Sequence, residues 1–415
     1  MPSARAATTP QTARYQEKRE AILDAAARLF SEQGVRGATL AGIAGSVGLV
    51  TNSVTYYYRK KEDLATACFQ RAIEVFDGLA RDALVAPDVP ERVLDFVRRY
   101  ARRLEAMEER REPTIVNFND IRALPAHQAE QVFAAYTDMF RRVRALLKGP
   151  RTAHLNREDL NARAHILLSV VHTMRAWIGN YEPDEYHRVA ERVGDLLLHG
   201  LPAAGARWQA EDRERDWRLS PALEGPSEAF LRAATVLVNE QGYRGASVDR
   251  ISARLNVTKG SFYHHHDNKQ DLISACFERS FAVVRQALRL AEDSAGSGWS
   301  RACAAGRALV RFQVSADGPL LRATATSALP DAAHREWVRL TTHRLTERMA
   351  SVVVDGMMDG SVRPLDPAIA AQGAIGAINA AAEMHRWVAS ATPDNVADLY
   401  VRPVFEGLLC PAAPA

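Results

Sequence analysis

Long apolar runs are missing from this chain of 415 residues. Its most apolar stretches, such as AHILLSVVHTM, are interrupted by His and Arg well short of the roughly 20 residues that a membrane-spanning helix needs. The N-terminal segment lacks the apolar core of a secretory signal. Hydrophobic residues make up 47% and charged residues 25%, which is typical of a globular protein. We therefore expect no membrane contact and a cytoplasmic location.

Cysteine is scarce, and its spacing excludes two kinds of site. Cys68, Cys276, Cys303 and Cys410 include no pair at CxxC spacing, so neither a zinc site nor a disulfide framework is indicated. We expect four buried, reduced thiols. The chain also lacks GxSxG, HExxH, a P-loop and a GxGxxG after a strand. These absences argue against an enzyme and against a bound cofactor or metal.

Lysine is rare among the cationic residues. Only six of the 53 Lys and Arg residues are Lys, and the net charge is +3, so bulk charge does not indicate a nucleic-acid partner. Five of the six lysines nevertheless lie in two segments, 18–61 and 259–269. Lysine is a compact point charge well suited to phosphate. These two segments therefore become candidates for DNA binding.

The chain contains an internal repeat with an offset of 208 residues. LFSEQGVRGATLAGIAGSVGL and LVNEQGYRGASVDRISARLNV align without a gap, and the match continues through Lys61/Lys269 to Cys68/Cys276. A repeat this long indicates duplication of a whole protein rather than a solenoid. The charged, Pro- and Gly-rich stretch between the copies, residues 202–226, is interpreted as a linker.

Each copy begins with the pattern of a helix-turn-helix. In the first copy, apolar residues from Ile22 to Phe30 recur at helical spacing. Gly34 is expected to end that helix, Thr39 to cap the next, and Gly48 to form a tight turn before a short helix that carries SVTYYY. The second copy repeats each step. In a helix-turn-helix, the second of the two short helices enters the major groove.

The segment TKGSFYHHHDNKQDL closely resembles the signature around the recognition helix of the tetracycline-repressor (TetR) family. LFSEQGVRGATL and LVNEQGYRGASV resemble that family's first helix and turn, so the resemblance covers about 50 residues in each copy. It implies an all-α fold of two tandem TetR-like units. Each unit would have a three-helix DNA-binding head and a helical ligand-binding domain, and the units would form a pseudo-twofold dimer within one chain.

The repeat and the resemblance divide the chain into five segments. These are an N-terminal arm with the first head (1–68), a regulatory domain (69–201), the linker (202–226), the second head (227–277) and a second regulatory domain (278–415). The last two helices of each copy, which pair across the dimer in the family, are expected at about 161–181, 184–199, 367–389 and 394–409. The small residues of AAQGAIGAINAAAE suit close helix packing.

The second head should carry the stronger DNA-binding set. Lys259 is expected to reach a guanine edge or a phosphate, Gly260 to allow close approach of the backbone, and Lys269 to hold a phosphate. Three consecutive helical histidines point about 100° apart, so the run 264–266 is not expected to bind one metal ion. The predicted contacts of this head are Ser247, Thr258, Lys259, Gly260, Ser261, Tyr263, His264, His265 and Lys269.

The first head departs from the family pattern. Asn52 replaces the usual Gly and Thr55 the usual Tyr, and Asn can read adenine. An alternative is a degenerate copy kept for packing, since Val50 is a poor helix cap. The arm before Ile22 is expected to be disordered in the free protein. The predicted contacts of this head are Thr39, Thr51, Asn52, Ser53, Thr55, Tyr56, Tyr57 and Lys61.

Polar or aromatic residues on otherwise apolar helices are the candidates for an effector pocket. A satisfied core polar group or a packing aromatic is the alternative for each of them. The candidates are Asn117, Asn119, His172, Trp177, Arg322, Trp337 and Trp387.

Together these patterns predict a DNA-binding transcriptional regulator, with a double-stranded operator and an unidentified small-molecule effector as partners. The resemblance favours a repressor that the effector releases. We expect one chain to act as an intramolecular pseudo-dimer, with association of two chains as the rival. An activator of the same fold, or a helical adaptor with a degenerate head, remains an alternative.

Overall fold

The structure, a computed structural model, describes residues 10–208, 217–220, 226–260, 268–322, 325–326, 329 and 331–411. Within these ranges the chain is helical, and its only extended pairing is an isolated bridge between Pro202 and Val362. None of the helices in these ranges combines the length and the apolar character needed to cross a membrane. The predicted all-α fold is confirmed.

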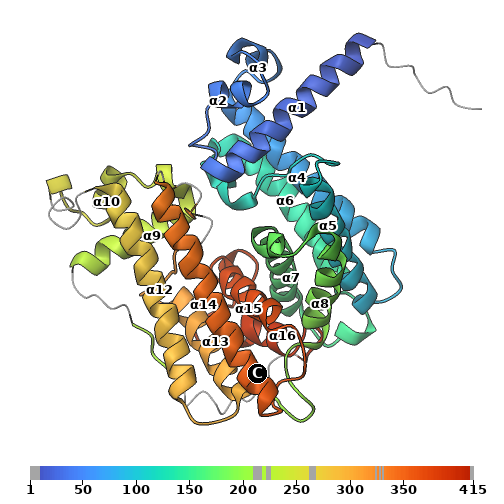
Figure 1. The fold of residues 1–415 in the computed structure, drawn as a ribbon, viewed down its shortest axis with the longest axis vertical. Helices are drawn as coiled ribbons and strands as arrows, with labels where there is room; N and C mark the ends of the chain where they lie inside the picture. The colour runs from blue at the N-terminus through green and yellow to red at the C-terminus, as the bar shows by residue number, and fades with distance from the viewer. Residues whose placement is uncertain are drawn as a thin grey trace, which may run out of the picture.

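Two sets of helices follow one another along the chain (Figure 1). The first set is α1 (Pro10–Gln33), α2 (Leu40–Ser46), α3 (Thr51–Tyr57), α4 (Lys61–Ala83), α5 (Val89–Glu108), η1 (Phe118–Ala123), α6 (Ala126–Leu146), η2 (Pro150–Thr152), α7 (Arg157–Trp177), η3 (Ile178–Asn180), η4 (Pro183–Glu185) and α8 (Tyr186–His199). The second is α9 (Pro226–Gly245), α10 (Val248–Arg254), α12 (Lys269–Asp293), α13 (Gly298–Val314), α14 (Ala332–Met358), α15 (Pro367–Ala381), η7 (Met384–Arg386), η8 (Ala397–Val401) and α16 (Arg402–Phe405).

The turns of the heads follow the predicted signals. Gly34 adopts a φ of 71° and its N–H donates to the Phe30 carbonyl at 3.0 Å. Gly48 adopts a φ of 67°, and in the second head Gly242 adopts a φ of 72°. Glycine enters this region of positive φ more readily than other residues because it has no Cβ. These glycines therefore end or turn the helices as the sequence predicted.

The predicted disorder of the N-terminal arm is wrong from Pro10 onward. Helix α1 begins at Pro10 and runs unbroken to Gln33. Tyr15, in the arm, packs against Tyr57 of α3 with ring centroids 4.8 Å apart. An aromatic contact of this kind stabilises the early turns of α1, which a composition argument could not anticipate.

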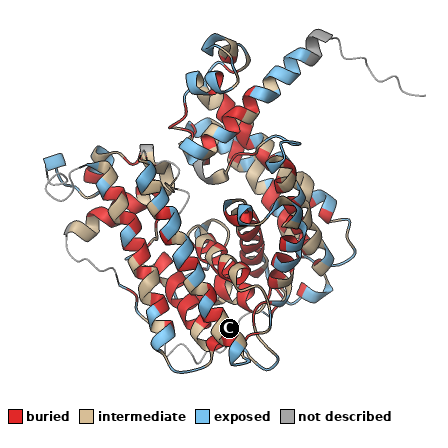
Figure 2. Cartoon of the chain, in the orientation of Figure 1, coloured by how far each residue is buried: buried red, intermediate tan, exposed pale blue. Residues whose placement is uncertain are grey.

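The core runs through both sets of helices (Figure 2). Helix α4 carries Leu64, Cys68, Phe69 and Phe76 on its buried face and packs against α1, α5 and α6. It therefore connects the first head rigidly to the helices behind it. The four cysteines are buried free thiols, and burial raises the pKa of Cys68 and Cys276 to about 12.

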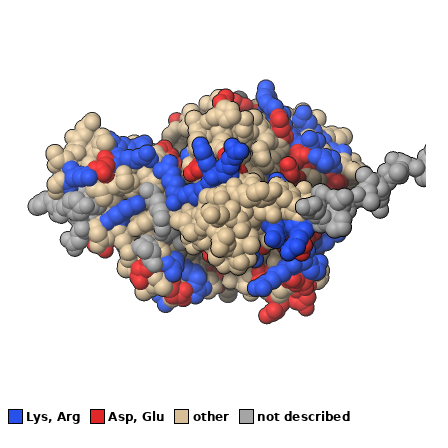
Figure 3. Space-filling model, turned by 90° about the horizontal axis from the view of Figure 1, so that it is seen from above, with Lys and Arg blue, Asp and Glu red and all other residues tan. Residues whose placement is uncertain are grey.

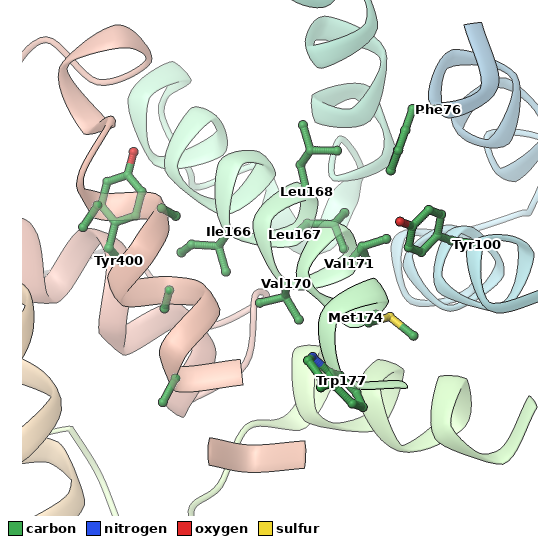
Figure 4. Packing of buried hydrophobic residues seen from close by; sticks show 14 of the residues in the cluster. Phe76, Tyr100, Ile166, Leu167, Leu168, Val170, Val171, Met174, Trp177 and Tyr400 are labelled. Carbon is green, nitrogen blue, oxygen red and sulfur yellow. The ribbon is translucent and has the colours of Figure 1, made fainter. Parts of the chain in front are cut away.

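Helix α7 is buried on almost every side, because it packs within its own unit and against the second unit. Figure 4 shows Leu168 and Val171 toward Phe76 and Tyr100 of the first unit, and Ile166 on the side of Tyr400 of the second. The buried positions of α7 include Asp159 and Arg163 as well as apolar residues, so protein covers both faces of the helix. Helix α7 is thus the centre of the contact between the units.

Small residues bring α15 close to the first unit. A Cβ added to Gly376 would lie 2.9 Å from Val170 Cγ2, and one added to Gly373 would lie 2.5 Å from Leu196 Cδ2. The Ser169 hydroxyl also donates to the Gly376 carbonyl at 2.9 Å. Small side chains at these positions allow the helices to approach closely. The two units are paired through α7 and α8 against α15, η8 and α16.

The last helices of the second unit are shorter than predicted. Helix α15 ends at Ala381 rather than at residue 389, and a π-helical segment, η8, precedes the short α16. Pro403 has no N–H to donate to the carbonyl one turn earlier, which disfavours a continuous α-helix here. Because proline tolerates only the first turn of a helix, α16 starts afresh at Arg402.

The first part of the predicted linker packs against the second unit. Ala203 N–H donates to the Ser361 carbonyl at 3.0 Å, and the Trp208 indole N–H donates to Asp398 at 2.7 Å. The Arg307 guanidinium lies 4.2 Å from the centroid of the Trp208 ring. Residues 202–208 are therefore held in place rather than forming a free coil.

We expect stability to fall as the pH falls from about 6.5 to 4. Burial lowers the pKa of His165 and of His172 to about 4, so in this window the unfolded chain binds more protons than the folded one. The lowered pKa of each histidine should reduce the free energy of unfolding by about 3 kcal/mol by pH 4. Denaturant titrations of His165→Gln should show a shallower decline than the parent. His199→Gln, at an exposed histidine, should keep the parent slope, and an unchanged slope for His165→Gln would contradict the assignment.

Candidate nucleic-acid interface

Helix α3 presents an exposed face that is anchored from behind. Val54 is fully buried and packs into the core. Thr51, Asn52 and Tyr56 are exposed, and Tyr56 keeps 76% of its surface accessible. Asn52 and Tyr56 are four residues apart and so share one face of the helix. The first head therefore displays the side chains that the sequence assigned to base reading.

Three tyrosines form an aromatic cluster at the end of α3. The rings of Tyr56 and Tyr57 lie 5.3 Å apart, and Tyr15 of α1 contacts both of them. No sequence pattern predicted this place for Tyr15, because no motif links α1 to α3 at this distance along the chain. Its position beside Tyr56 extends the exposed aromatic surface at this end of α3.

The remaining predicted residues of α3 are only half-exposed. The Thr55 hydroxyl donates to the Asn52 carbonyl at 3.0 Å, so its proton is already used inside the helix. Ser53 and Tyr57 are also half-buried. Val50 stands at the N-cap without a side-chain hydrogen bond, as the sequence indicated.

The same capping geometry occurs at the start of α2 and of α10. Thr39 Oγ1 accepts from Gly42 N–H at 3.0 Å, and Ser247 Oγ accepts from Arg250 N–H at 3.3 Å. Accepting this bond leaves each hydroxyl proton able to donate elsewhere. Both residues thus fit the predicted contact to phosphate while they stabilise their helices.

Lys259 of the second head pairs with an acidic neighbour. Its ammonium lies 2.6 Å from the carboxylate of Asp249 on α10, and both side chains are more than half exposed. Thr258 and Gly260 are exposed beside it. The predicted contacts Ser261, Tyr263, His264 and His265 lie outside the described residues.

The lysines that begin α4 and α12 make contacts that no sequence motif predicted. Lys61 Nζ donates to the Ala38 carbonyl at 3.0 Å and to the Arg36 carbonyl at 3.4 Å. Lys269 donates to the Tyr243 carbonyl and lies 4.1 Å from the centroid of the Tyr243 ring. Each lysine therefore fastens the turn after the first helix of its own head. The predicted phosphate contact would have to use the remaining ammonium protons.

Replacing Lys61 by Ala is expected to lower the free energy of unfolding by about 1–2 kcal/mol. Hydrogen bonds to charged groups contribute about 1.5–3 kcal/mol, and partial solvent exposure reduces this value. Lys148→Ala removes an exposed lysine and should change stability by less than about 0.5 kcal/mol. Thermal and denaturant unfolding measure the change in stability of both variants. Equal effects of the two substitutions would contradict the role of Lys61 in the turn.

An arginine in each unit connects the head to the helices behind it. Arg71 of α4 pairs with Glu20 at 3.3 Å and donates to the Thr114 carbonyl at 2.8 Å. At the same offset of 208, Arg279 of α12 pairs with Glu228 at 2.6 Å and donates to the Pro319 carbonyl at 3.2 Å. Neither arginine was among the residues predicted from the sequence. The sequence signal for this pair was that Glu20 and Arg71 are separated by the same number of residues as Glu228 and Arg279.

The pocket candidates of the first unit do not all come together. His172 stacks on Phe118 of η1 at 5.3 Å and lies near Phe76. Trp177 is buried beside Tyr181, and its indole N–H has no hydrogen-bond partner among the described residues. Asn117 stands at the start of η1, and the Asn119 side chain is outside the description. The structure therefore groups His172 with η1 and leaves Trp177 separate.

The candidates of the second unit are more widely spread. Arg322 pairs with Glu383 at 2.8 Å, and these two lie where the units meet, because Arg122 of the first unit is 3.8 Å from the same carboxylate. Trp387 stacks on Phe140 of the first unit with centroids 3.6 Å apart. Trp337 contacts Phe281 at 5.6 Å within its own unit. Arg322 and Trp387 thus lie at the interface between the units. Their contacts do not support a role in an effector pocket.

The family model for the tetR family of bacterial regulatory proteins matches this chain twice, at residues 22–68 and 230–276. Both heads are tetR-family DNA-binding domains. The two matches coincide with the two heads and are separated by the offset found in the sequence. The recognition of two fused TetR-like units is confirmed.

Curated relatives are similar to this chain over limited lengths. The Tn10 TetC protein of Escherichia coli is 37% identical over 73 residues, which are 18% of this chain and 36% of TetC. The IcaR negative regulator of Staphylococcus epidermidis is 40% identical over 54 residues, 13% of this chain and 29% of IcaR. The FasR activator of Mycolicibacterium smegmatis is 33% identical over 109 residues, 25% of this chain and 44% of FasR. The chain thus spans less than half the length of each.

Among solved structures, the crystal structure of apo AibR is 22% identical to this chain. The match covers 44% of this chain and 99% of AibR, with a TM-score of 0.36.

Proposed function

We propose that this protein is a DNA-binding transcriptional repressor in which one chain does the work of a dimer. The main support is that the two units, each with a helix-turn-helix head, pack together within one chain through α7 and α8 against α15, η8 and α16. A dimer with two identical recognition helices reads two inverted identical half-sites, about one turn of DNA apart. Here the exposed residues differ between the heads, Thr51 and Asn52 in one and Lys259 and Gly260 in the other. The proposed operator therefore has two different half-sites.

Release by a small-molecule effector is the second part of the proposal. The effector would bind behind the heads, near the aromatic group of Phe76, Phe118 and His172. Movement there would reach the first head through α4 and through Arg71, which links the Thr114 carbonyl to Glu20. A few kcal/mol of differential affinity between the two states is enough to change operator occupancy.

The direction of regulation rests on similarity alone. The name of IcaR describes a negative regulator and that of FasR an activator, and no residue of this chain decides between them. An activator of the same architecture is therefore the second candidate. A helical adaptor is less well supported, because the first head keeps an exposed α3 and a capped α2.

Selection of bound duplexes from a random DNA pool, followed by footprinting, tests the proposal. We expect one non-palindromic site of two different half-sites. Light scattering and titration of that site should give one chain per duplex. A perfectly symmetric site, or two chains per duplex, would overturn the single-chain pseudo-dimer, and the recovery of no specific site would overturn DNA reading itself.

A further inference from the structure

The two heads touch each other beside their expected DNA-facing ends. A Cβ added to Gly245, at the end of α9, would lie 2.6 Å from Nη1 of Arg36. Arg36 belongs to the turn between α1 and α2 of the first head, so it reaches across to the second head. Segment η1 of the first unit also packs against α9. The heads therefore share a boundary that includes charged side chains from both.

A cleft of about 560 Å³ opens at this boundary. Its lining residues are Arg36, Arg122, Glu240, Gln241 and Arg250. We name it the inter-head cleft. Pockets for small effectors are lined mostly by apolar and aromatic side chains, whereas these five are all charged or amide-bearing. Glu240 lies 3.6 Å from Arg254, outside this set, which offsets its charge. Positive charge therefore predominates in the lining of the cleft.

The position of the cleft relates it to DNA. Arg36 precedes the capping residue Thr39 by three positions, and Arg250 donates its backbone N–H to the capping hydroxyl of Ser247. The Arg250 side chain is held by the Gly245 carbonyl at 3.3 Å and by Gln241. Figure 3 shows Lys and Arg side chains gathered across the middle of the face seen from above. Arg36 and Arg250 thus each lie three residues along the chain from one of the two helix starts that carry the expected phosphate contacts.

We propose that the inter-head cleft binds the phosphodiester backbone of the operator segment between the two half-sites. This inference rests on the proposed function, since it requires both heads on one duplex. Arginine recognises phosphate oxygens through a planar fork of N–H donors. Contacts to the backbone position a protein without reading sequence. Arg36, Arg122 and Arg250 would therefore fix the spacing of the half-sites and leave base preference to the recognition helices.

DNA is favoured over a free anion by exposure and by geometry. The Arg122 side chain is 40% exposed and is already 3.8 Å from Glu383, so an isolated phosphate would compete with water and with that carboxylate. A duplex held by both heads presents its central phosphates to the cleft at a high effective concentration. The central backbone can thus occupy a site that would hold a free phosphate only weakly.

The test uses the duplex recovered by selection, remade with neutral methylphosphonates in place of the phosphates between the half-sites. The cleft variant carries the triple substitution Arg36→Gln, Arg122→Gln and Arg250→Gln. The control variant has the same change in charge at three exposed arginines of the first unit, Arg81→Gln, Arg141→Gln and Arg188→Gln. Affinity is measured against salt concentration for the full-length protein.

We expect the cleft variant to flatten the log–log salt slope by about 2–3 units on unmodified DNA, at about 0.9 per phosphate contact. The cleft variant should keep the parent base preference, and its salt slope should be no flatter on the methylphosphonate duplex than on unmodified DNA. The control variant should bind both duplexes as the parent does. The parent protein should itself show a flatter salt slope on the methylphosphonate duplex than on unmodified DNA. This result does not depend on how well the variant folds.

Two results would overturn the inference while leaving the proposed function intact. One is a parent protein that binds the methylphosphonate duplex with an unchanged slope. The other is saturable binding of inorganic phosphate to the DNA-free protein, seen as a thermal shift and lost in the cleft variant, since it would assign the cleft to a free anion. Failure of the selection to recover any specific site would instead overturn the proposed function, and this inference with it.

Discussion

Replacing Arg163 by Ala is expected to lower the free energy of unfolding by about 3–5 kcal/mol. The Arg163 side chain is 2% exposed and lies 3.8 Å from the carboxylate of Asp159. Its Nε donates to the Leu408 carbonyl at 2.9 Å and its Nη2 to the Cys410 carbonyl at 3.0 Å. Removal of the guanidinium leaves a buried carboxylate and two carbonyls without this donor. Denaturant titration of the full chain measures the loss.

The loss should fall mainly on the contact between the units, because Leu408 and Cys410 belong to the second unit and Arg163 to the first. Arg188→Ala serves as the control, since Arg188 and its partner Glu185 are both largely exposed. An exposed pair of this kind contributes about 0–1 kcal/mol. If the two substitutions destabilised the protein equally, the buried arginine would not hold the units together as its contacts indicate.

Replacing Lys259 by Ala is expected to weaken the recognition of one half-site by about 1–3 kcal/mol, or roughly 5- to 150-fold. In the free protein the Lys259 ammonium lies 2.6 Å from Asp249, but both side chains are more than half exposed. Because exposed ion pairs are weak, little energy is needed to transfer the ammonium to a base edge. Selectivity for the other half-site should remain at the parent value.

Asn52→Ala provides the matched substitution in the first head, where Asn52 is exposed on α3. It should relax selectivity in the opposite half-site. Binding to a panel of duplexes, each with one base pair changed, measures both variants. If either substitution weakened both halves equally, the heads would not be assigned to separate half-sites.

Much of the candidate interface was predictable from local sequence. The capping positions Thr39 and Ser247 and the turn glycines Gly34 and Gly242 follow from chemistry that acts within a few residues. The exposure of Thr51, Asn52 and Tyr56 follows from helical periodicity once Val54 is placed in the core. These features depend on neighbours along the chain, so the sequence contains the information.

Contacts between distant residues were not predictable in the same way. Tyr15 meets Tyr56 and Tyr57 across some forty residues, and Lys61 turns back to the carbonyls of residues 36 and 38. Trp387 was a pocket candidate because it is a large aromatic on an apolar segment, yet it stacks on Phe140 of the other unit. Burial alone cannot tell a pocket wall from an interface, because both place an aromatic ring out of water.

The sequence by itself determined that two TetR-like units follow one another, since a gapless repeat with helix caps and turn glycines depends only on local order. The tertiary structure decided how the units meet. It placed Arg163 against the C-terminal carbonyls, Gly376 against Val170, and Arg36 beside Gly245. These contacts join residues more than 200 positions apart, and their energies come from burial and close packing, which no local pattern specifies.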